Sequence, residues 1–343
     1  MIGRMSSLQF HQSSLDVLLD AQVRLQRTQE ELASGKRILS PSDDPVSTAQ
    51  ILNLRSELSR VETFQRNIDM ATNELASTET TVAAVEDVLN RARELALMAG
   101  NPTLNDANRS AIATEIDGLR EQLISLANTT TASGESLFAG FATDAAAFSD
   151  TTNQADDDNW VDIGTDLYVD NAYLSQVTYE GDANVRQVNI AKGITISTRI
   201  AGEELFGESA FSESNDTATV NAFEALGLLA QGVRSQLPSP PAETPLGDDV
   251  DSKAVIDAAL SGIDSALERA SDVRADLGVR MNRVDDQASL HYDFSLSISK
   301  TISGLEDLDY AKAVSDLSAR MLALESAQKA YSKMQGISLF NYL

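Results

Sequence analysis

Apolar side chains recur every seven residues along much of the N-terminal third of the chain. One series of seven-residue steps is apolar throughout: Leu54, Val61, Ile68, Leu75, Val82, Leu89 and Ala96. A companion series is apolar at all positions but one: Phe64, Ala71, Thr78, Val85, Ala92 and Ala99. A 3.5-residue repeat held over this length predicts a helix that supercoils left-handedly against a partner helix.

Local signals predict where this helix begins and ends. Asp44 is a good helix-capping residue, and Pro45 suits the first helical position because a proline there loses no hydrogen bond. Gly100, followed by Asn101 and Pro102, predicts the end. Two further helical segments carry stripes of the same kind. They are 107–128, with Ile112, Ile116, Leu119, Leu123 and Leu126, and 251–300, with Ile256, Ile263, Ala270, Leu277 and Val284.

The apolar pattern at each end of the chain predicts one more amphipathic helix. The N-terminal stripe comprises Leu8, Leu15, Leu18, Leu25 and Leu32, with Gln22 and Gln29 at the remaining seam positions. The C-terminal stripe comprises Val314, Leu317, Met321, Leu324, Ala327, Tyr331 and Met334. No nearby segment covers either face, so we expect the two helices to pair with each other or with neighbouring molecules. The predicted interface residues are Leu8, Leu15, Leu18, Leu25, Leu32, Leu317, Met321, Leu324, Tyr331 and Met334.

The middle of the chain differs in composition from both ends. Residues 121–252 hold 22 acidic side chains and only four basic ones. Short alternating runs at 176–180, 185–190 and 194–198, and a similar run around Trp160 and Tyr168, predict β-strands. The sequence therefore predicts a mainly α protein, in which the N- and C-terminal segments form a long antiparallel coiled-coil rod with a β-rich domain inserted at its tip. The expected parts are terminal helices at 1–40 and 305–343, a helical rod at 41–141 and 211–304, and an acidic β-rich domain at 142–210.

The composition excludes several classes of function. The chain of 343 residues carries a formal net charge of −26. Because a sequence-independent grip on nucleic acid or on an anionic membrane needs a basic stripe, we expect neither partner. The absence of cysteine excludes disulfides and thiol chemistry. No apolar run reaches the ~18 residues of a membrane span, and the first residues lack the apolar core of a cleavable signal peptide.

Few residues could carry chemistry. The acidic segment 156–166 would suit calcium, but Val161 and Leu167 stand where an EF-type loop has glycine and glutamate, which favours a solvated acidic loop. His11 and His291 each lack a second histidine nearby, which favours packing over ligation or catalysis. No nucleophile, base and orienting group can be named together. The sequence thus predicts a protein that is not an enzyme and has no catalytic residue, cofactor or metal.

Several motifs together resemble the bacterial flagellin superfamily, and in particular its hook–filament junction branch. The Ser-Pro-Ser-Asp-Asp-Pro segment at 40–45 is similar to that branch, whereas filament flagellins usually carry an alanine-rich Lys-Asp-Asp-Ala version. The resemblance covers about 1–141 and 251–343 closely and the β-rich insert loosely. The segments that carry it are 32–45, 65–69, 137–141, 203–207, 278–283, 305–311 and 336–343.

The resemblance implies a structural protein of the bacterial flagellum that forms the ring at the hook–filament junction. The implied partners are further copies of the chain, a neighbouring hook-associated protein on the hook side, flagellin on the filament side, a cytoplasmic export chaperone and the flagellar type III export apparatus. The implied location is the extracellular flagellum, reached without a cleavable signal peptide. Terminal helices of the superfamily are disordered in the free monomer and pair on assembly.

Two other interpretations remain open at this point. The first is a filament flagellin, which the segment at 40–45 and the ending Leu339–Leu343 disfavour. The second belongs to a different class, the coiled-coil stalk of an adhesin or a sensor. A sensor would need a membrane span and an adhesin a secretion signal or an anchor, and neither is found in the sequence.

Overall fold

The computed structural model describes residues 7–101, 103–131, 133–150, 160–162, 168–170, 177–207, 220–234 and 252–340. Over these residues the protein is mainly α-helical with small antiparallel sheets, as the sequence predicts. The chain forms two compact units. The first unit combines residues 1–62 with 291–343, and the second is residues 63–290. The boundaries predicted from the sequence concern parts that would fold independently, and they stay predictions.

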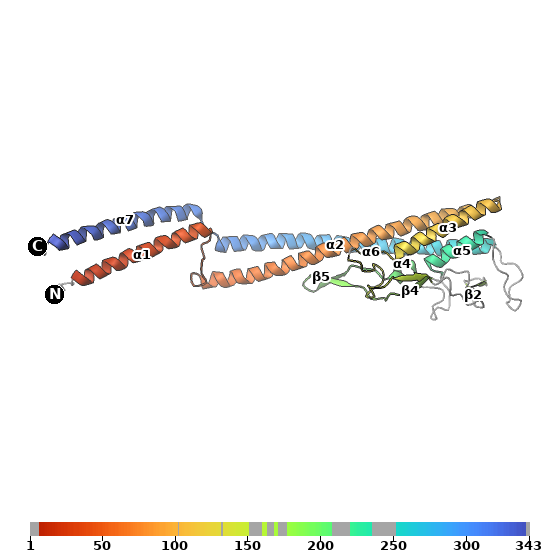
Figure 1. Ribbon diagram of the computed structural model, residues 1–343, viewed down its shortest axis with the longest axis horizontal. Helices are drawn as coiled ribbons and strands as arrows, with labels where there is room; N and C mark the ends of the chain where they lie inside the picture. The colour runs from red at the N-terminus through yellow and green to blue at the C-terminus, as the bar shows by residue number, and fades with distance from the viewer. Residues whose placement is uncertain are drawn as a thin grey trace. The chain divides into compact units, whose positions relative to one another are not determined.

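The first unit is built from both ends of the chain. It contains α1 (Ser7–Ser34), α7 (Tyr310–Phe340), the start of α2 (Pro45–Ala99) and the end of α6 (Ser252–Glu306). Helices α1 and α7 lie side by side (Figure 1). They are therefore paired within one chain in this structure, while the state of the two ends in a dilute monomer stays a prediction.

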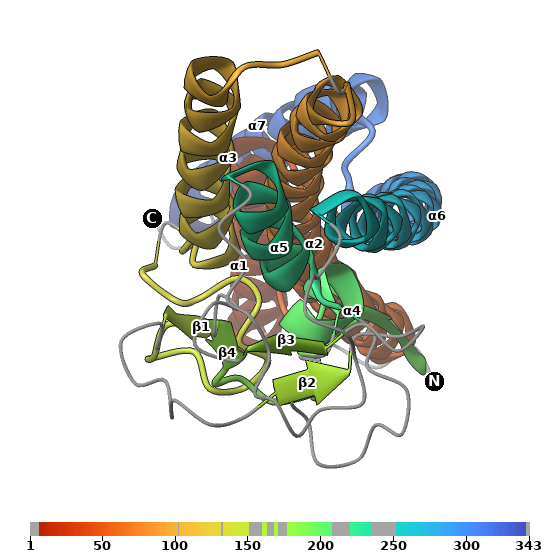
Figure 2. The ribbon, with the colours of Figure 1, turned by 90° about the vertical axis from the view of Figure 1, so that its right-hand side faces the viewer.

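The second unit contains the remainder of α2 and α6 together with three shorter helices. These are α3 (Asp106–Ala127), α4 (Gly202–Phe206) and α5 (Ala222–Arg234). Helix α5 is buried on nearly all sides, and Figure 2 shows it among α2, α3 and α6. Asn221 and Glu224 form a capping box at its start, because the Asn221 side chain accepts from the Glu224 amide and the Glu224 carboxylate accepts from the Asn221 amide. An apolar helix enclosed in this way forms the core of the unit.

The heptad positions predicted from the sequence are the buried positions of α2 and α6. All thirteen positions of the two α2 series are buried except Leu54 and Phe64. All five α6 stripe positions between Ile256 and Val284 are buried as well. Burial of each large apolar side chain contributes roughly 1.5–3 kcal/mol, so these stripes hold the helices together. The predicted start of α2 at Asp44-Pro45 and its end at Gly100 are confirmed, and α6 runs six residues beyond the predicted Lys300.

Ion pairs between α2 and α6 show the relative direction of the two helices within the second unit. Arg274 of α6 pairs with Glu79 and Glu86 of α2, and Asp264 of α6 pairs with Arg93 of α2. Residue numbers therefore rise along one helix as they fall along the other. The two helices are antiparallel, as predicted.

The strands form three two-stranded antiparallel sheets within the described residues. Strand β1 (Phe148–Asp150) pairs with β4 (Val177–Tyr179), β2 (Trp160–Asp162) with β3 (Tyr168–Asp170), and β5 (Gln187–Ala191) with β6 (Ile194–Ser197). Each predicted alternating run contains a strand. The turn between β5 and β6 passes through Gly193, whose φ of 77° is a left-handed conformation that glycine adopts without strain.

The β5–β6 hairpin lies alongside the helices. The Asn67 side chain of α2 donates to the Asn189 carbonyl of β5 at 2.8 Å, about thirty residues before α2 ends. Arg280 of α6 donates to the Ser197 and Arg199 carbonyls at 3.3 Å. The sequence predicts an insert at the tip of the rod; the structure adds that this hairpin folds back against the side of α2 and α6.

Aromatic rings join the strands to the short helices. Phe148 of β1 lies 5.1 Å from both Phe206 of α4 and Tyr179 of β4, measured between ring centroids. Phe223 of α5 lies 5.2 Å from Phe148 and 5.1 Å from Phe206. Offset and edge-on aromatic pairs contribute more than their buried area alone. This cluster holds the strands against the helical core, and the heptad pattern gives no sign of it.

Candidate assembly interface

The α1–α7 pair uses one stripe of each helix. On α1, Leu18, Leu25 and Leu32 are half-buried and Thr28 is buried. The inward stripe of α7 consists of Ala313, Leu317, Arg320, Leu324, Ala327 and Tyr331. Steps of three and four residues place these side chains on one face of each helix.

Two heptad frames compete on α1, and the structure selects the one with the smaller side chains. Both frames share Leu18, Leu25 and Leu32. The sequence favours Leu15, with Gln22 and Gln29, as companions, whereas the structure places Ala21 and Thr28 toward α7 and leaves both glutamines exposed. Leu15 is consequently 44% exposed. The predicted role of the glutamines as polar seam residues is therefore wrong for this helix pair, because small side chains at 21 and 28 make room for a partner from α7.

Arg320 is that partner, and α7 shows the same shift of frame. Its guanidinium donates to the Thr28 hydroxyl at 2.6 Å and to the Arg24 carbonyl at 2.7 Å. Arg320 thus occupies the seam beside Leu317 and Leu324, while Met321 lies 53% exposed on the outside. A charged hydrogen bond to a buried hydroxyl fixes the register of two helices more sharply than apolar contact does. Counting sevens from Ala313 to Arg320 to Ala327 is the sequence signal that could have revealed this frame.

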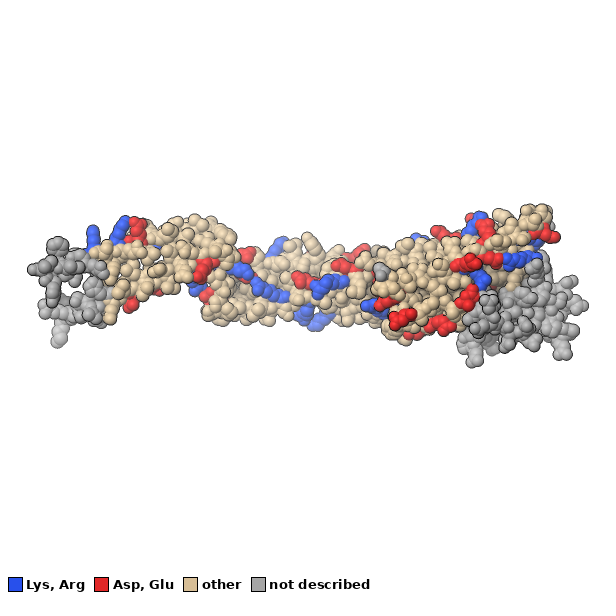
Figure 3. Space-filling view, viewed as in Figure 1, with Lys and Arg blue, Asp and Glu red and all other residues tan. Residues whose placement is uncertain are grey.

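Apolar side chains remain uncovered on the outer faces of the pair. On α1, Leu15, Leu19 and Val23 follow one another at four-residue steps with exposures of 44%, 59% and 63%. Figure 3 shows the visible face of α1 and α7 as mostly uncharged surface. A hollow of about 480 Å³ lies over the pair, lined by Leu25, Ser318, Met321, Leu322, Leu324, Glu325 and Gln328. Uncovered apolar faces of this kind mark sites of interaction with other molecules. The side chains of Leu8 and Met334 lie outside the described residues.

The connectors at the base of the pair are ordered by carboxylates. Asp43 accepts from the Leu39 and Ser40 amides at 3.2 and 3.0 Å and pairs with Arg27 of α1 at 2.9 Å. Asp44 accepts from the Ser47 amide at 3.0 Å and from its hydroxyl at 2.6 Å, which caps α2 as predicted. The Ser-Pro-Ser-Asp-Asp-Pro segment is thus a turn followed by a helix cap.

Another carboxylate, Glu306 at the end of α6, joins the two connectors. It is 8% exposed, and its two oxygens lie 2.5 Å from Lys36 Nζ and 2.6 Å from Arg55 Nη2. Its carbonyl accepts from the Arg37 amide at 2.8 Å, and the Arg37 guanidinium donates to the Leu305 carbonyl at 2.8 Å. Hydrogen bonds, chiefly from Lys36, lower the pKa of Glu306.

We expect the turn at 39–47 to loosen in acid. The pKa of Asp43 is lowered chiefly by the Ser40 amide, and that of Asp44 chiefly by the Ser47 hydroxyl. Because both folded-state pKa values lie below those of the unfolded chain, the stability they contribute is present above about pH 4 and is lost as the pH falls further. Amide exchange at Ser40 and Ser47, corrected for intrinsic rates, should accelerate over that range. A Ser47 amide whose protection did not change with pH would contradict this, and Asp44→Asn should remove the pH dependence at Ser47 alone.

Two family models match the ends of the chain. The bacterial flagellin N-terminal helical region matches residues 5–143, and the bacterial flagellin C-terminal helical region matches residues 260–343. Together they cover well over half of the sequence and include both helices of the α1–α7 pair. The chain belongs to the bacterial flagellin family.

Two relatives that match this flagellin-family chain from end to end are hook-associated proteins. The flagellar hook-associated protein 3 of Escherichia coli is 28% identical over 345 residues, which covers 98% of each chain. The Salmonella typhimurium protein of the same name is 26% identical, again over 98% of each chain. A solved flagellar hook-associated protein from Vibrio parahaemolyticus matches 77% of this chain and 100% of its own at 24% identity and a TM-score of 0.62. The flagellar junction protein of Legionella pneumophila matches 76% and 100%, at 18% identity and a TM-score of 0.53, and shows the same fold. The family resemblance read from the motifs is confirmed, and the protein is a flagellar component.

A buried charge cluster in the second unit of this flagellin-family chain was not predicted. Arg199 is 1% exposed and follows strand β6. Its guanidinium lies 3.2 Å from Glu74 of α2, pairs with Glu135 and donates to the Ser136 carbonyl at 3.3 Å. The hydrogen bond from Arg199 is the main cause of the lowered pKa of Glu135. The only available signal was a basic residue directly after an apolar strand in an acidic stretch.

The described part of this flagellin-family chain carries neither a metal-ligating cluster nor a membrane-spanning helix. No group of three or more histidine, aspartate or glutamate side chains there could hold a metal ion. No helix among the described residues is both long and apolar enough to span a membrane. His291 is buried, as the packing interpretation predicts, whereas the His11 side chain and most of the acidic segment 156–166 lie outside the described residues.

Proposed function

We propose that this chain is the structural subunit of the junction between the flagellar hook and the filament. The observation that carries the proposal is similarity to hook-associated protein 3 from end to end, over 98% of both chains. The flagellin of Listeria innocua, by comparison, is 24% identical over 85% of this chain and 81% of its own. The turn at 40–45 supports the junction protein over a filament flagellin, and both family matches count against an adhesin or sensor stalk.

The α1–α7 pair supports a role in assembly. Its inward stripes cover each other, but the outer stripe at Leu15, Leu19 and Val23 has no cover in a single chain. Copies of the chain arranged in a ring would bury these faces against one another, with a hook-associated protein on the hook side and flagellin on the filament side. The ten predicted interface residues would serve this contact either directly or by holding the pair together.

Uncovered apolar faces also support protection before assembly. A solvated apolar helix needs a cover while the chain is inside the cell, and an export chaperone would bind α7 as a helix laid in an apolar groove. The flagellar type III export apparatus would then carry the chain to the extracellular flagellum without a cleavable signal peptide. In this role the protein is structural, acts without a cofactor and is not an enzyme.

Deletion of the gene in its source bacterium tests the proposal. We expect hooks of normal length that carry no filament, with flagellin released into the medium as monomer. Complementation with the intact gene should restore filaments. Filaments growing on hooks in the deletion strain would reject the junction role, and hooks without any secreted flagellin would favour the filament flagellin interpretation instead.

A further inference from the structure

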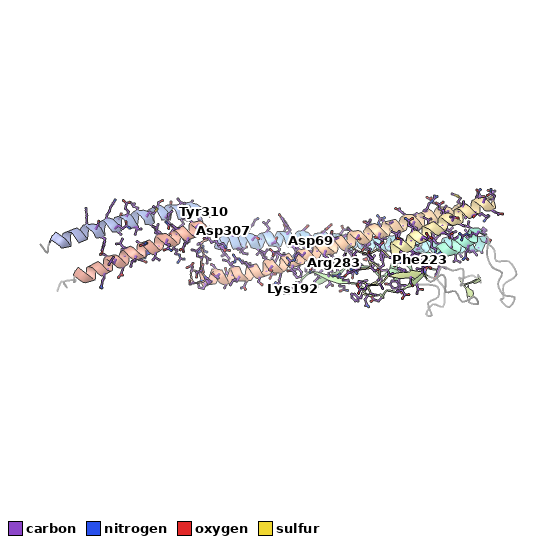
Figure 4. The ribbon with its side chains drawn as sticks, in the orientation of Figure 1. Asp69, Lys192, Phe223, Arg283, Asp307 and Tyr310 are labelled. Carbon is purple, nitrogen blue, oxygen red and sulfur yellow. The ribbon has the colours of Figure 1, made fainter. Side chains whose placement is uncertain are left out.

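The two connectors of the first unit differ in length, and the structure ties the long one to the short one. Ten residues, 35–44, join α1 to α2, whereas only 307–309 separate α6 from α7. Lys36 forms an isolated β-bridge with Asp307, and the Leu308 amide donates to the Gly35 carbonyl at 3.0 Å. Asp307 and Tyr310 lie where α6 gives way to α7 (Figure 4). The chain leaving α1 is thus bound to the chain entering α7.

Gly35 makes this close approach possible. Its φ is 70°, and the Tyr310 hydroxyl lies 2.7 Å from the position that a Cβ would occupy. Any other side chain at 35 would meet a strained backbone and crowd the Tyr310 hydroxyl. The close contact between the two connectors therefore requires glycine at position 35.

The end of α6 is capped by residues far away in the sequence. The last carbonyls of a helix have no partner within it, and here Arg37 supplies donors to those of Leu305 and Glu306. A glutamate in the last turn is also unfavourable, because the negative end of the helix dipole lies there. Glu306 is offset by two cations, Lys36 from the connector and Arg55 from α2. The carboxylate is thus well placed only when all three segments have come together.

Apolar packing alone does not hold the connector to α2. A hollow of about 490 Å³ lies beside it, lined by Ser34, Lys36, Ile38, Leu39, Ser40, Pro41, Thr48, Ile51, Leu52, Arg55 and Glu306. Charged groups near Glu306 also include Asp307, which accepts from the Ser303 hydroxyl, and Asp44, which lies 3.9 Å from Arg37. Lys36 and Arg55 are the two cations that contact the Glu306 carboxylate among the described residues.

We infer that Glu306 is the positioning residue of the assembly interface. By joining Lys36 to Arg55, it holds the ten-residue connector in one conformation. It thereby sets how the α1–α7 pair leaves the start of α2 and the end of α6 within the first unit. This inference rests on the proposed function for its purpose, but the contact itself belongs to the single chain. It assigns to the connector a task separate from that of the apolar seam. Loss of the contact frees the connector without altering the stripe residues of α1 and α7.

Amide exchange in the full-length chain tests the inference without any assembly. The Arg37 and Leu308 amides donate across the junction, so their exchange reports whether it is closed. In Glu306→Lys we expect exchange at both amides to accelerate about tenfold or more, because two contacts become repulsive. The double variant Glu306→Lys with Arg55→Glu should recover most of the protection. Glu325→Lys, which alters an exposed carboxylate of α7 paired with Lys329, is the matched control and should leave both amides unchanged.

Every result of these exchange measurements either supports or overturns the role inferred for Glu306. Protection that is unchanged in Glu306→Lys, or a double variant no better than the single one, would overturn the inference. So would wild-type Arg37 and Leu308 amides that exchange at unfolded-chain rates. Exchange that follows the charge pattern supports it whatever the gene deletion shows, so failure of the proposed function and failure of this contact are distinguishable.

Discussion

A chain that carries aspartate at both 317 and 324 is expected to leave hooks without filaments. Both leucines are half-buried on the stripe of α7 that faces α1. Placing two carboxylates there removes apolar contacts and requires desolvation of the charges, at a cost of several kcal/mol. Arg320 lies between them in the seam, but pairing with either aspartate would draw its guanidinium away from Thr28 and the Arg24 carbonyl, the contacts that set the register. The α1–α7 pair would then be unable to close, and the outer stripes that it positions would be lost with it.

The double variant should keep a normally folded second unit. Residues 63–290 contain neither position, so the thermal unfolding of that unit should match the wild type. Filaments per hook, counted by electron microscopy, give the functional result, and the amount of secreted chain shows whether chaperone binding and export fail as well. Ser315→Asp with Ser326→Asp adds the same charge to exposed positions opposite the seam, so its α1–α7 pair should still close. Wild-type filament numbers on the Leu317 and Leu324 variant would show that the pair is not required.

Replacement of Arg199 by alanine is expected to destabilise the second unit by about 3–5 kcal/mol. The guanidinium is 1% exposed, and its removal leaves Glu74, whose side chain is 13% exposed, without its closest cation. The carboxylate must then be buried unpaired or draw in water, and either change weakens the contact between α2 and the segment that follows β6. Urea denaturation followed by circular dichroism measures the loss.

Arg186 provides the matched control because it faces the same two carboxylates from a more exposed position. Its guanidinium lies 3.7 Å from Glu74 and 3.5 Å from Glu135, with the side chain 42% exposed. Arg186→Ala should cost less than about 1 kcal/mol. The pKa of Glu135 is lowered in the folded protein, so the wild type should lose stability as the pH falls below the ordinary glutamate range, and Arg199→Ala should lose less. Equal losses in the two arginine variants would contradict the assigned role of burial.

The long helices could be predicted closely from the sequence because their stripes repeat over many turns. A single misfit such as Thr78 does not disturb a pattern that Ile68, Leu75 and Val82 impose together, and the buried positions of α2 follow it. The β-strands were found for a similar reason, since period-two alternation bounded by turn residues is typical of half-buried strands. Repetition is what makes such predictions reliable.

The face that each helix of the α1–α7 pair turns toward the other could not be predicted, because two heptad frames share the same leucines. Leu15 is more apolar than Ala21 or Thr28, but Gln22 and Gln29 are more polar than either, so hydrophobicity alone does not choose between the two companion series. What decides the frame is the bond from Arg320 to Thr28, which joins positions almost three hundred residues apart. The same holds for Arg199 and Glu306, whose partners are set by the fold rather than by their neighbours in sequence. Specific polar contacts of this kind do not recur at a fixed spacing along the sequence, so a search for periodicity does not find them.

The division of the chain also sets the order in which its parts can be completed. Residues 63–290 are continuous, so this unit can form as soon as that stretch is available, whichever end of the chain emerges first. The first unit needs both ends, and the cap that Arg37 places on Glu306 spans more than three quarters of the polypeptide. Closing so long a loop carries a large entropic cost when the intervening chain is disordered and a smaller one once it has become a compact body. The α1–α7 pair and its outer surfaces therefore form last, after residues 63–290 have folded.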